Sequence, residues 1–595
     1  MKYFLVGHRG VGKTTLLNEV GKLDSEFIGI DLDAEVAKRV GKSIFEIFEM
    51  EGEKQFRRYE EETLRHCLAN CTDEKDYLIA LGAGYQGEIP DSSVVIWIQR
   101  STDVDGRTFL DRPDWSRSEL GTEAYMSRFP QRQEYYKKIS DLEWMVPEGV
   151  HSQSAKSFLN FIKSNPEGPY GDFDFTLDNK SIENSFLIHR LIQLGIRRFE
   201  IRDDLIEELV AKKFMERVGA EKILLSCRTV NGWGPKLFER VGLVDWPAEW
   251  GKCPEEVDHI LSVHGKGNQL KSYSKLLVEN RTSFTVGFKL ALSVESFEQL
   301  AEGHKWYLED SQRRSFLPMS KEGRWQWYRQ LKGISMQLHF LRLGWGLGVN
   351  DQPLFFSHHL YSVLPFKEFA AVIGDPIHHS WTPSFQYDYF AKHAIPVVGI
   401  KLTEMDVDNG FLNWLHEIGL KFAAVTSPIK KRVYDWVENH KNSKVIGEAY
   451  GSSVNTLLWK GGEVAATNTD AVGFQALVAE HVAGKVAVWG GGGTEGIIRE
   501  SIPKAIFYSA RSGAPRGDRV SMEEPDLVVW AVGAQHLDSI QWPPKHWKPG
   551  VVIDLNYSEN SPGREYAKKS GAEYISGSEM FKHQGLAQQQ FWELQ

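Results

Sequence analysis

The sequence opens with a glycine-rich loop of the form G-x-x-x-x-G-K-T, which constrains the fold of the first part of the chain more than any other feature. An apolar run precedes the loop at residues 3–6, and a helix-like pattern follows it at residues 15–20. A strand, a loop whose glycines let backbone N–H groups close around an anion, and the positive end of a helix together bind phosphate. We therefore predict that Lys13 reaches the β- and γ-phosphates of a nucleotide and that the Thr14 hydroxyl holds Mg²⁺. The residues predicted to bind the nucleotide are Gly7, Gly10, Gly12, Lys13 and Thr14.

The composition narrows the class of protein. At 595 residues the chain is too long for a single hydrophobic core, so we expect several domains. The net charge of −10 and the lack of a basic block give no support for a nucleic-acid or membrane-surface partner. A helix that carries Cys67 and Cys71 is a simpler interpretation than a metal site. No apolar stretch is long enough to span a membrane or to act as a signal peptide, so we expect a cytoplasmic protein.

Residues 1–165 carry further polar residues after the loop. The run FIGIDLDAEV predicts a buried strand that ends in Asp31 and Asp33. Side chains alternate along a strand, so one carboxylate could lie near Mg²⁺ and the other near an acceptor hydroxyl. Capping of a helix start is the alternative for both. Charged residues and glycines then follow in a fixed order: Arg57, Gly82, Gly84, Arg112 and Arg132.

This series resembles shikimate kinase over nearly the whole segment. The matching motifs are the phosphate loop, D-x-D, G-E-x-x-F-R-x-x-E, a G-x-G turn, R-P in a lid, and R-x-x-x-Y. The resemblance implies in-line phosphoryl transfer from ATP to shikimate, with Asp31 near Mg²⁺ and Asp33 as the catalytic carboxylate on the shikimate hydroxyl. It implies that Arg112 closes a lid over the phosphates. The implied shikimate-binding residues are Arg57, Gly82, Gly84 and Arg132.

Residues 170–360 show a different pattern. Eight short apolar runs, from FDFTLD to GWGLGVND, alternate with helical patterns and predict a (β/α)8 barrel. Lys289 stands inside the apolar run VGFKLAL, where burial and neighbouring arginines would lower its pKa and make its amine nucleophilic. A salt bridge inside the barrel is the alternative for each polar residue taken singly. The polar residues at the ends of the runs are Glu200, Arg202, Asp204, Arg228, Asp245, His264 and Lys289.

This set resembles type I 3-dehydroquinate dehydratase. The resemblance implies an imine between Lys289 and the substrate ketone, with His264 moving protons. The implied substrate-binding residues are Glu200, Arg202, Arg228 and Gln352. The segment departs from the pattern in three places. RTVNGWG lacks a glutamate expected after Arg228, Pro247 replaces an acid, and Trp327 stands where an arginine is expected, with Arg329 two positions later.

The last region divides at about residue 475. Ser380 and Thr382 lie in a turn that could hold a carboxylate. The run KVAVWGGGGTEGII combines a strand, a glycine turn and a helix start, which is typical of dinucleotide binding. Arg511 follows the next strand, where it would meet a 2′-phosphate and favour NADP over NAD; a solvated surface charge is the alternative. The glycines of the turn that would approach the cofactor are Gly490, Gly492 and Gly493.

The whole region resembles shikimate dehydrogenase through the motifs P-I-x-H-S-x-T-P, V-T-x-P-x-K, V-N-T and N-T-D. The resemblance implies a substrate lobe at 366–475 and a Rossmann-like NADP domain at 476–595, with a C-terminal helix that returns to the substrate lobe. It implies that Lys430 and Asp470 transfer the proton when NADPH reduces 3-dehydroshikimate. Trp530 and Val532 replace residues that usually line the cofactor. The implied substrate-binding residues are Ser380, Thr382, Thr426, Asn455, Tyr557 and Gln584.

The order of the three regions resembles the C-terminal part of the fungal pentafunctional arom polypeptide. It predicts an α/β protein that converts the small molecules 3-dehydroquinate, 3-dehydroshikimate and shikimate in consecutive reactions. Two alternatives stay open: a metabolite-sensing regulator like the fungal quinate-pathway repressors, and a bifunctional enzyme whose barrel has decayed. Retention of Lys13, Lys289 and Lys430 favours an enzyme, because a sensor can lose such residues and still bind. Assembly as a homodimer is left open.

Overall fold

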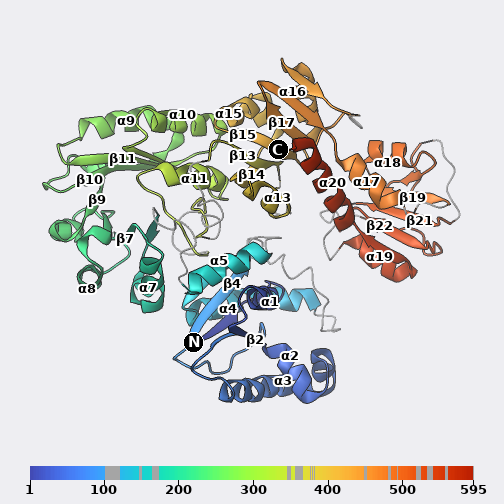
Figure 1. The fold of residues 1–595 in the computed structure, drawn as a ribbon, viewed down its shortest axis with the longest axis horizontal. Helices are drawn as coiled ribbons and strands as arrows, with labels where there is room; N and C mark the ends of the chain where they lie inside the picture. The colour runs from blue at the N-terminus through green and yellow to red at the C-terminus, as the bar shows by residue number, and fades with distance from the viewer. Residues whose placement is uncertain are drawn as a thin grey trace. The chain divides into compact units, whose positions relative to one another are not determined.

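The computed structural model describes most of the chain, and its strands fall into four sheets (Figure 1). The described residues up to 355 form one compact unit, and those from 366 onward form a second. The sequence predictions for Arg112, Gly492, Gly493 and Tyr557 lie outside the described residues. The described residues are 1–100, 121–146, 151–163, 173–344, 350–355, 366–375, 377, 380, 382–447, 452–479, 481, 484–491, 494–517, 524–532, 540–556 and 561–593.

The first sheet is parallel throughout, in the order β2-β3-β1-β4-β5. Its strands are β1 (Lys2–Val6), β2 (Phe27–Asp31), β3 (Asp76–Ala80), β4 (Val94–Arg100) and β5 (Leu142–Val146). Its helices are α1 (Lys13–Leu23), α2 (Leu32–Val40), α3 (Ile44–Ala69), α4 (Gly121–Ile139) and α5 (His151–Lys163). The predicted strand ending in Asp33 is wrong in one respect. The strand stops at Asp31, whose side chain caps α2, so Asp33 lies in the first helical turn.

The second sheet holds seven parallel strands in sequential order. They are β6 (Asp174–Thr176), β7 (Arg198–Arg202), β8 (Ile223–Ser226), β9 (Leu243–Pro247), β10 (His259–Lys266), β11 (Thr285–Ser293) and β12 (Arg314–Met319). The helices of this part are α6 (Asn179–Glu183), α7 (Ser185–Gln193), α8 (Glu208–Val218), α9 (Leu270–Glu279), α10 (Phe297–Leu308) and α11 (Gln326–Lys332).

The eighth position of the barrel is taken by the segment around Phe340. Phe340 forms a parallel bridge with Asp174 of β6, and the Leu338 N–H donates to Ser315 Oγ of β12 at 3.1 Å. The closing segment therefore precedes the predicted run GWGLGVND. His339 and Arg342 interrupt the apolar pattern of this segment, although both are buried in the structure. A sequence pattern counts such residues as exposed, which is why the segment was not predicted as a strand.

The barrel places one helix very close to its sheet at Gly303 of α10. A Cβ added there would lie 2.0 Å from Cζ of the Phe316 ring on β12. We expect Gly303→Ala to lower the free energy of unfolding of the barrel by about 1–3 kcal/mol, because overpacking outweighs the gain in helix propensity. Urea unfolding measures the change. Gly21→Ala in α1 is the matched control, since a Cβ there meets nothing within 4 Å and should stabilise its helix. Equal effects at both glycines would contradict the packing argument.

The second unit contains a mixed sheet in the order β14-β13-β15-β17-β18-β16, in which β17 runs antiparallel to its neighbours. Its strands are β13 (Phe369–Gly374), β14 (Val397–Lys401), β15 (Leu420–Val425), β16 (Ser443–Val445), β17 (Thr456–Lys460) and β18 (Glu463–Thr467). The helices of this lobe are α13 (Thr382–Ala391), α14 (Glu404–Asp408), α15 (Phe411–Glu417) and α16 (Lys430–Asn439), and α17 (Asp470–Ala479) follows the sheet.

The fourth sheet is parallel and has the order β20-β19-β21-β22-β23. The last helix, α20 (Gly577–Trp592), leaves this sheet and packs on the mixed one (Figure 1), where Trp592 Nε1 donates to Leu457 O at 3.0 Å. The helices that accompany α20 are α18 (Glu495–Ser501) and α19 (Pro562–Ser570). The strands are β19 (Val486–Gly490), β20 (Ile506–Tyr508), β21 (Leu527–Ala531), β22 (Val551–Asp554) and β23 (Glu573–Ser576).

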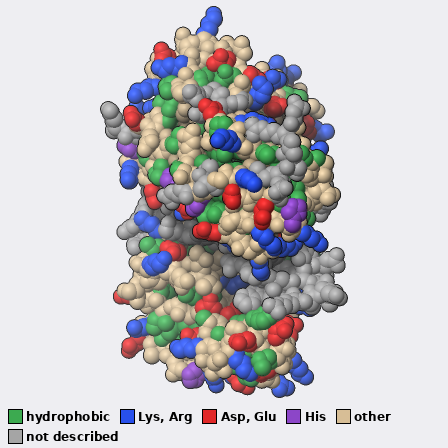
Figure 2. Space-filling model, turned by 90° about the vertical axis from the view of Figure 1, so that its right-hand side faces the viewer, with side chains coloured by type: hydrophobic (Ala, Val, Ile, Leu, Met, Phe, Trp, Pro, Cys, Tyr) green, Lys and Arg blue, Asp and Glu red, His purple; other side chains and the backbone are tan. Residues whose placement is uncertain are grey.

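The outer surface shows no concentration of one charge on the face seen in Figure 2, where basic and acidic side chains are interspersed. Among the helices that the structure describes, none has the length and apolarity needed to cross a bilayer.

Candidate active sites

The phosphate loop joins β1 to α1 and has the backbone that an anion site requires. Gly10 and Gly12 adopt φ angles of 83° and 96°, which favour glycine. A Cβ on Gly7 would lie 2.4 Å from Ile98 O of β4, so only glycine fits at this position too. Lys13 Nζ donates to Gly7 O at 2.7 Å and to His8 O at 2.9 Å, which holds its charge inside the loop.

A hydroxyl and a carboxylate meet beside this loop. Thr14 Oγ1 donates to Asp31 Oδ2 at 2.6 Å, while Asp31 Oδ1 accepts from the Ala34 N–H at 3.2 Å. The capping interpretation of Asp31 is thus confirmed for one oxygen, and the other oxygen faces Thr14. Its place near Mg²⁺ stays a prediction. Because hydroxyl and carboxylate oxygens are ligands that Mg²⁺ accepts, this pair fits the predicted metal site.

The G-x-G turn after β3 brings together charged residues that are distant in sequence. A Cβ on Gly84 would lie 2.1 Å from Arg57 Nη2 and 3.1 Å from Arg132 Nη2. A Cβ on Gly82 would lie 2.5 Å from Glu60 Oε1 and 3.0 Å from Asp33 Oδ1. The predicted substrate residues of this region thus form one cluster, and the glycines leave the space that the charged groups occupy.

Glu60 is a member of this cluster that the sequence predictions did not include among the site residues. It is fully buried and accepts a hydrogen bond from Arg57 Nη1 at 2.5 Å. Burial raises the pKa of Glu60 to about 7, against the lowering effect of Arg57, and the charge of Asp33 adds to the increase. Burial and the charge of Asp31 also raise the pKa of Asp33. The signal was present in the sequence, because Glu60 stands three residues after Arg57 on a helix, where the two side chains meet.

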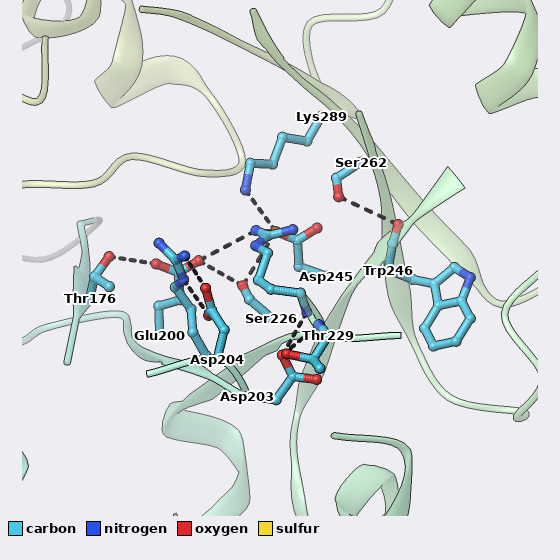
Figure 3. A network of polar contacts seen from close by, with 12 residues as sticks. Thr176, Glu200, Asp203, Asp204, Ser226, Thr229, Asp245, Trp246, Ser262 and Lys289 are labelled. Atoms are coloured by element: carbon cyan, nitrogen blue, oxygen red, sulfur yellow. Dashed lines mark hydrogen bonds and ion pairs between the residues drawn. The ribbon is translucent and has the colours of Figure 1, made fainter. Parts of the chain in front are cut away.

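The barrel site centres on Asp245 of β9, a residue that is completely buried (Figure 3). Its Oδ2 accepts hydrogen bonds from Lys289 Nζ and from Arg228 Nη2, both at 2.7 Å. Ser226 Oγ donates to Glu200 Oε1 at 2.6 Å, which joins Glu200 to the same network. Although burial opposes ionisation, the charges of Arg228 and Lys289 hold the pKa of Asp245 well below its usual range. Burial lowers the pKa of Lys289, and Asp245 opposes that change.

His264 and Lys289 lie on neighbouring strands. Ser262 of β10 pairs with Lys289 of β11, and His264 pairs with Ala291. Residues two apart on a strand share a face, so His264 lies one layer closer to the C-terminal ends of the strands than Lys289. Desolvation and the charges of Lys289 and Arg228 lower the pKa of His264, which keeps the imidazole neutral at pH 7. Its side chain nevertheless reaches solvent at the barrel end.

Other predicted barrel residues are placed less favourably. Arg202 pairs with Asp204 at 2.6 Å, so its charge is already matched. Gln352 is buried, and its Oε1 has no hydrogen-bond partner in the described part of the chain. The segment after Arg228 lies beside Asp203, because a Cβ on Gly232 would lie 2.6 Å from Asp203 Oδ2.

The second unit pairs Lys430 with Asp470. Lys430 begins α16 and Asp470 begins α17, and Lys430 Nζ donates to Asp470 Oδ2. The other carboxylate oxygen accepts from Asn455 Nδ2 at 2.8 Å. Thr469 N–H in turn donates to Asn455 Oδ1 at 2.8 Å, so the amide orientation is determined. Both Asp470 oxygens are engaged, which holds the carboxylate beside the lysine.

The predicted substrate residues of this unit lie on neighbouring elements. Ser380 Oγ donates to Thr382 Oγ1 at 3.1 Å at the start of α13. Thr426 lies at the end of β15, where its Cγ2 is 2.4 Å from the position of a Cβ on Gly374. Gln584 of α20 packs on Gly473, one turn after Asp470 on α17. The C-terminal helix therefore carries Gln584 to the helix that begins at Asp470.

The glycine turn after β19 has a backbone that favours glycine, as in turns where a ligand comes close to the main chain. Gly490 has a φ of 92°, and a Cβ there would lie 2.6 Å from Val532 Cγ2 and 2.8 Å from Ala531 O. Arg511 follows β20 and is exposed. Trp530 is fully buried, and its ring stacks on Tyr566 with 5.8 Å between the centroids. Trp530 thus contributes to the core of this sheet.

The first sheet, its phosphate loop and the Thr14–Asp31 pair define a P-loop phosphotransferase. A family model for shikimate kinase matches residues 9–163. The shikimate kinase of Methylococcus capsulatus is 32% identical over 162 residues, which cover 25% of this chain and 84% of that protein. Through this segment the chain belongs to the shikimate kinase family.

The C-terminal region is similar to shikimate dehydrogenase. The NADP(+)-dependent shikimate dehydrogenase of Maridesulfovibrio salexigens is 29% identical over 255 residues, which cover 38% of this chain and 92% of that protein. The crystal structure of shikimate dehydrogenase from Aquifex aeolicus covers 38% of this chain at 19% identity, with a TM-score of 0.32. That comparison covers 92% of the Aquifex chain. The sheets of the structure make the chain an α/β protein, with a P-loop kinase domain at its start and, in the second unit, a parallel sheet of the Rossmann type with a glycine turn after its strand β19.

Proposed function

We propose that this chain is a trifunctional enzyme that dehydrates 3-dehydroquinate, reduces 3-dehydroshikimate with NADPH and phosphorylates shikimate with ATP. The observation that carries the proposal is that one chain is similar to two enzymes named for the same compound, shikimate kinase and shikimate dehydrogenase. The product of the dehydrogenase is the substrate of the kinase. The barrel between them carries a buried lysine, which suits the preceding dehydration.

In the kinase reaction, Lys13 and the loop N–H groups stabilise the charge that develops on the transferred phosphoryl group. Thr14 and Asp31 would hold Mg²⁺, which neutralises phosphate charge when it is bound. Asp33 accepts the proton of the shikimate hydroxyl. Arg57 and Arg132, which meet at Gly84, bind the shikimate carboxylate.

In the dehydrogenase reaction, NADPH supplies the hydride. Lys430 donates a proton to the oxygen of the substrate ketone as negative charge develops there, and Asp470 keeps the ammonium group oriented. Ser380 and Thr382 offer hydroxyl groups to the substrate carboxylate. Arg511 is exposed after β20, the strand that pairs with β19, and binds the 2′-phosphate that distinguishes NADPH from NADH.

In the barrel, the Lys289 amine adds to the ketone carbon of 3-dehydroquinate and water leaves, which forms an imine. The Lys289 amine donates to Asp245, so this hydrogen bond must break before its nitrogen reaches the ketone carbon. Neutral His264, one layer above it, accepts a proton and returns it to the leaving hydroxyl in the elimination. Hydrolysis of the product imine then restores the amine.

Borohydride trapping tests the barrel chemistry, because borohydride reduces an imine to a stable amine. Protein incubated with 3-dehydroquinate and borohydride is expected to gain the mass of one ligand on the peptide that contains Lys289. Lys289→Met should gain none. His264→Ala should still form the adduct, while its steady-state dehydration falls by about 10²-fold or more. If the wild-type protein forms no adduct while its kinase and dehydrogenase are active, the dehydratase assignment is wrong.

A second candidate function is a barrel that binds its ligand without turnover, as in a metabolite-sensing regulator. Two observations favour it: the segment after Arg228 lacks the expected glutamate, and the Lys289 amine is engaged by the buried carboxylate of Asp245. Saturable ligand binding without an adduct would support this candidate. Loss of all three turnovers would extend it to the whole chain.

The pKa of Glu60 predicts how the kinase responds to pH. Ionised Glu60 holds Arg57 at the shikimate site, so kcat/KM for shikimate should fall as the pH decreases from 8 to 6, with one ionisation near pH 7. The folded state holds this proton more tightly than the unfolded chain between pH 4.5 and about 7, so the contribution of Glu60 to stability decreases as the pH rises through that range.

Glu60→Gln should remove the ionisation near pH 7 from the kcat/KM profile for shikimate. Glu53→Gln, which removes the half-exposed partner of Arg57, should retain it. An unchanged profile in Glu60→Gln would assign the ionisation elsewhere.

A further inference from the structure

The fourth sheet reverses its strand order beside the glycine turn. Strand β19 has β20 on one side and β21 on the other, so the chain crosses β19 when it passes from β20 to β21. Ligands of open parallel sheets bind in the crevice at the carboxyl ends of the strands, at the point where the strand order reverses. In this sheet the crevice lies between Gly490, which ends β19, and Val532, which follows β21. A dinucleotide that binds this sheet therefore meets Val532.

Val532 forms one wall of this crevice. Its side chain is buried, and its Cγ2 would lie 2.6 Å from a Cβ on Gly490. The Gly491 N–H donates to Ala531 O at 3.0 Å, which ties the glycine turn to the end of β21. The position of the backbone at residues 531 and 532 therefore determines the width of the crevice.

A side chain from the next strand holds this backbone in place. Asn556 follows β22, and its Nδ2 donates to Val532 O at 2.8 Å and to Asp554 Oδ1 at 2.9 Å. The Asn556 N–H donates to the same carboxylate oxygen at 2.9 Å, and Asp554 is fully buried. Because a carbonyl and a carboxylate oxygen only accept hydrogen bonds, these partners determine the orientation of the amide.

The backbone around Asn556 is anchored independently of this amide. The Leu555 N–H donates to Trp530 O at 2.9 Å, and the N–H of Gly577, the first residue of α20, donates to Asn556 O at 3.1 Å. A change of the Asn556 side chain is thus expected to leave its own main chain in place and to release Val532 O.

We propose that Asn556 is a positioning residue for the dinucleotide, because it holds Val532 where the crevice accepts the part of the cofactor that NADPH and NADH share. The assignment of this crevice to NADPH rests on the proposed function. Asn556 acts through Val532 on the β21 side of β19. Arg511 follows β20 on the other side, where the 2′-phosphate is expected, and only NADPH carries that group. The two residues should therefore affect cofactor binding in different ways.

Asn556→Leu keeps a side chain of similar shape and removes its hydrogen-bond donors. It should raise the Kd of NADPH and the Kd of NADH by the same factor, about 10-fold, because Val532 is no longer held at the crevice. Arg511→Ala should raise the Kd of NADPH alone. Fluorescence of the reduced nicotinamide measures binding to the full chain, with excess ADP filling the phosphate loop. Asn556→Ala should give the same result as leucine and serves where leucine prevents folding.

Ser570→Ala is the control for a loss of stability in the same domain. Ser570 Oγ donates to Tyr566 O at 2.9 Å and to Ala567 O at 3.2 Å, so its removal should lower the thermal midpoint and leave both Kd values unchanged. If the Asn556 variants also lower only the thermal midpoint, the residue is structural and the proposal is overturned. Weaker binding of NADPH alone would overturn it as well. A wild-type chain that binds neither cofactor would refute the NADP site itself, which distinguishes that failure from the failure of Asn556.

Discussion

Replacement of Lys430 with methionine should lower kcat for reduction of 3-dehydroshikimate by about 10³-fold. Ketone reduction places negative charge on an oxygen atom, and without a proton donor that charge remains in a partly buried site. Asp470 would then face the oxygen with no intervening cation, which adds an unfavourable interaction. The loss of NADPH absorbance at 340 nm measures the rate.

The matched control for this prediction is Lys431→Met. Lys431 is the next residue of α16, its side chain is exposed, and it pairs with Asp435 on the same helix. This variant should retain the rate within about twofold, because exposed helix pairs contribute little. A loss in Lys431→Met as large as that in Lys430→Met would show that the charge of the helix start, and not a specific proton donor, supports the reaction. Shikimate phosphorylation should stay unchanged in both variants.

Lys13→Met should lower kcat for phosphorylation of shikimate by about 10³-fold or more. The Lys13 ammonium group lies inside the loop, within 2.9 Å of two backbone oxygens. When a nucleotide binds in the loop, the ammonium group exchanges these contacts for contacts with phosphate oxygens. Methionine fills the same volume without charge, so the loop should keep its fold while losing stabilisation of the transferred group. ADP release that depends on shikimate measures the rate.

Lys22→Met is the control for this prediction, because Lys22 is an exposed lysine near the other end of α1 and pairs with Glu19. It should leave phosphorylation unchanged. Reduction of 3-dehydroshikimate should stay at the wild-type rate in Lys13→Met, since that reaction is assigned to the other compact unit. Retained phosphorylation in Lys13→Met would remove the loop from the reaction.

Much of the fold and of the candidate sites could be predicted from local sequence motifs. The phosphate loop binds through backbone N–H groups of consecutive residues, so its spacing in sequence is also its geometry, and Gly10 and Gly12 adopt the positive φ angles that favour glycine. The parallel sheets follow similarly from apolar runs that alternate with helical patterns. Lys289 was recognisable because a lysine within an apolar strand must be buried or reach a site, and the structure buries it.

Tertiary structure decided the features that depend on residues distant in sequence. Only the fold shows that Asp245 accepts from both Arg228 and Lys289, or that the segment around Phe340 pairs with β6 and closes the barrel. The structure shows that Asp31 caps α2 with one oxygen and faces Thr14 with the other, which the sequence left open. The sequence by itself determined the local elements and their order, whereas burial and pairing of charges depend on long-range packing and were decided only by the tertiary structure.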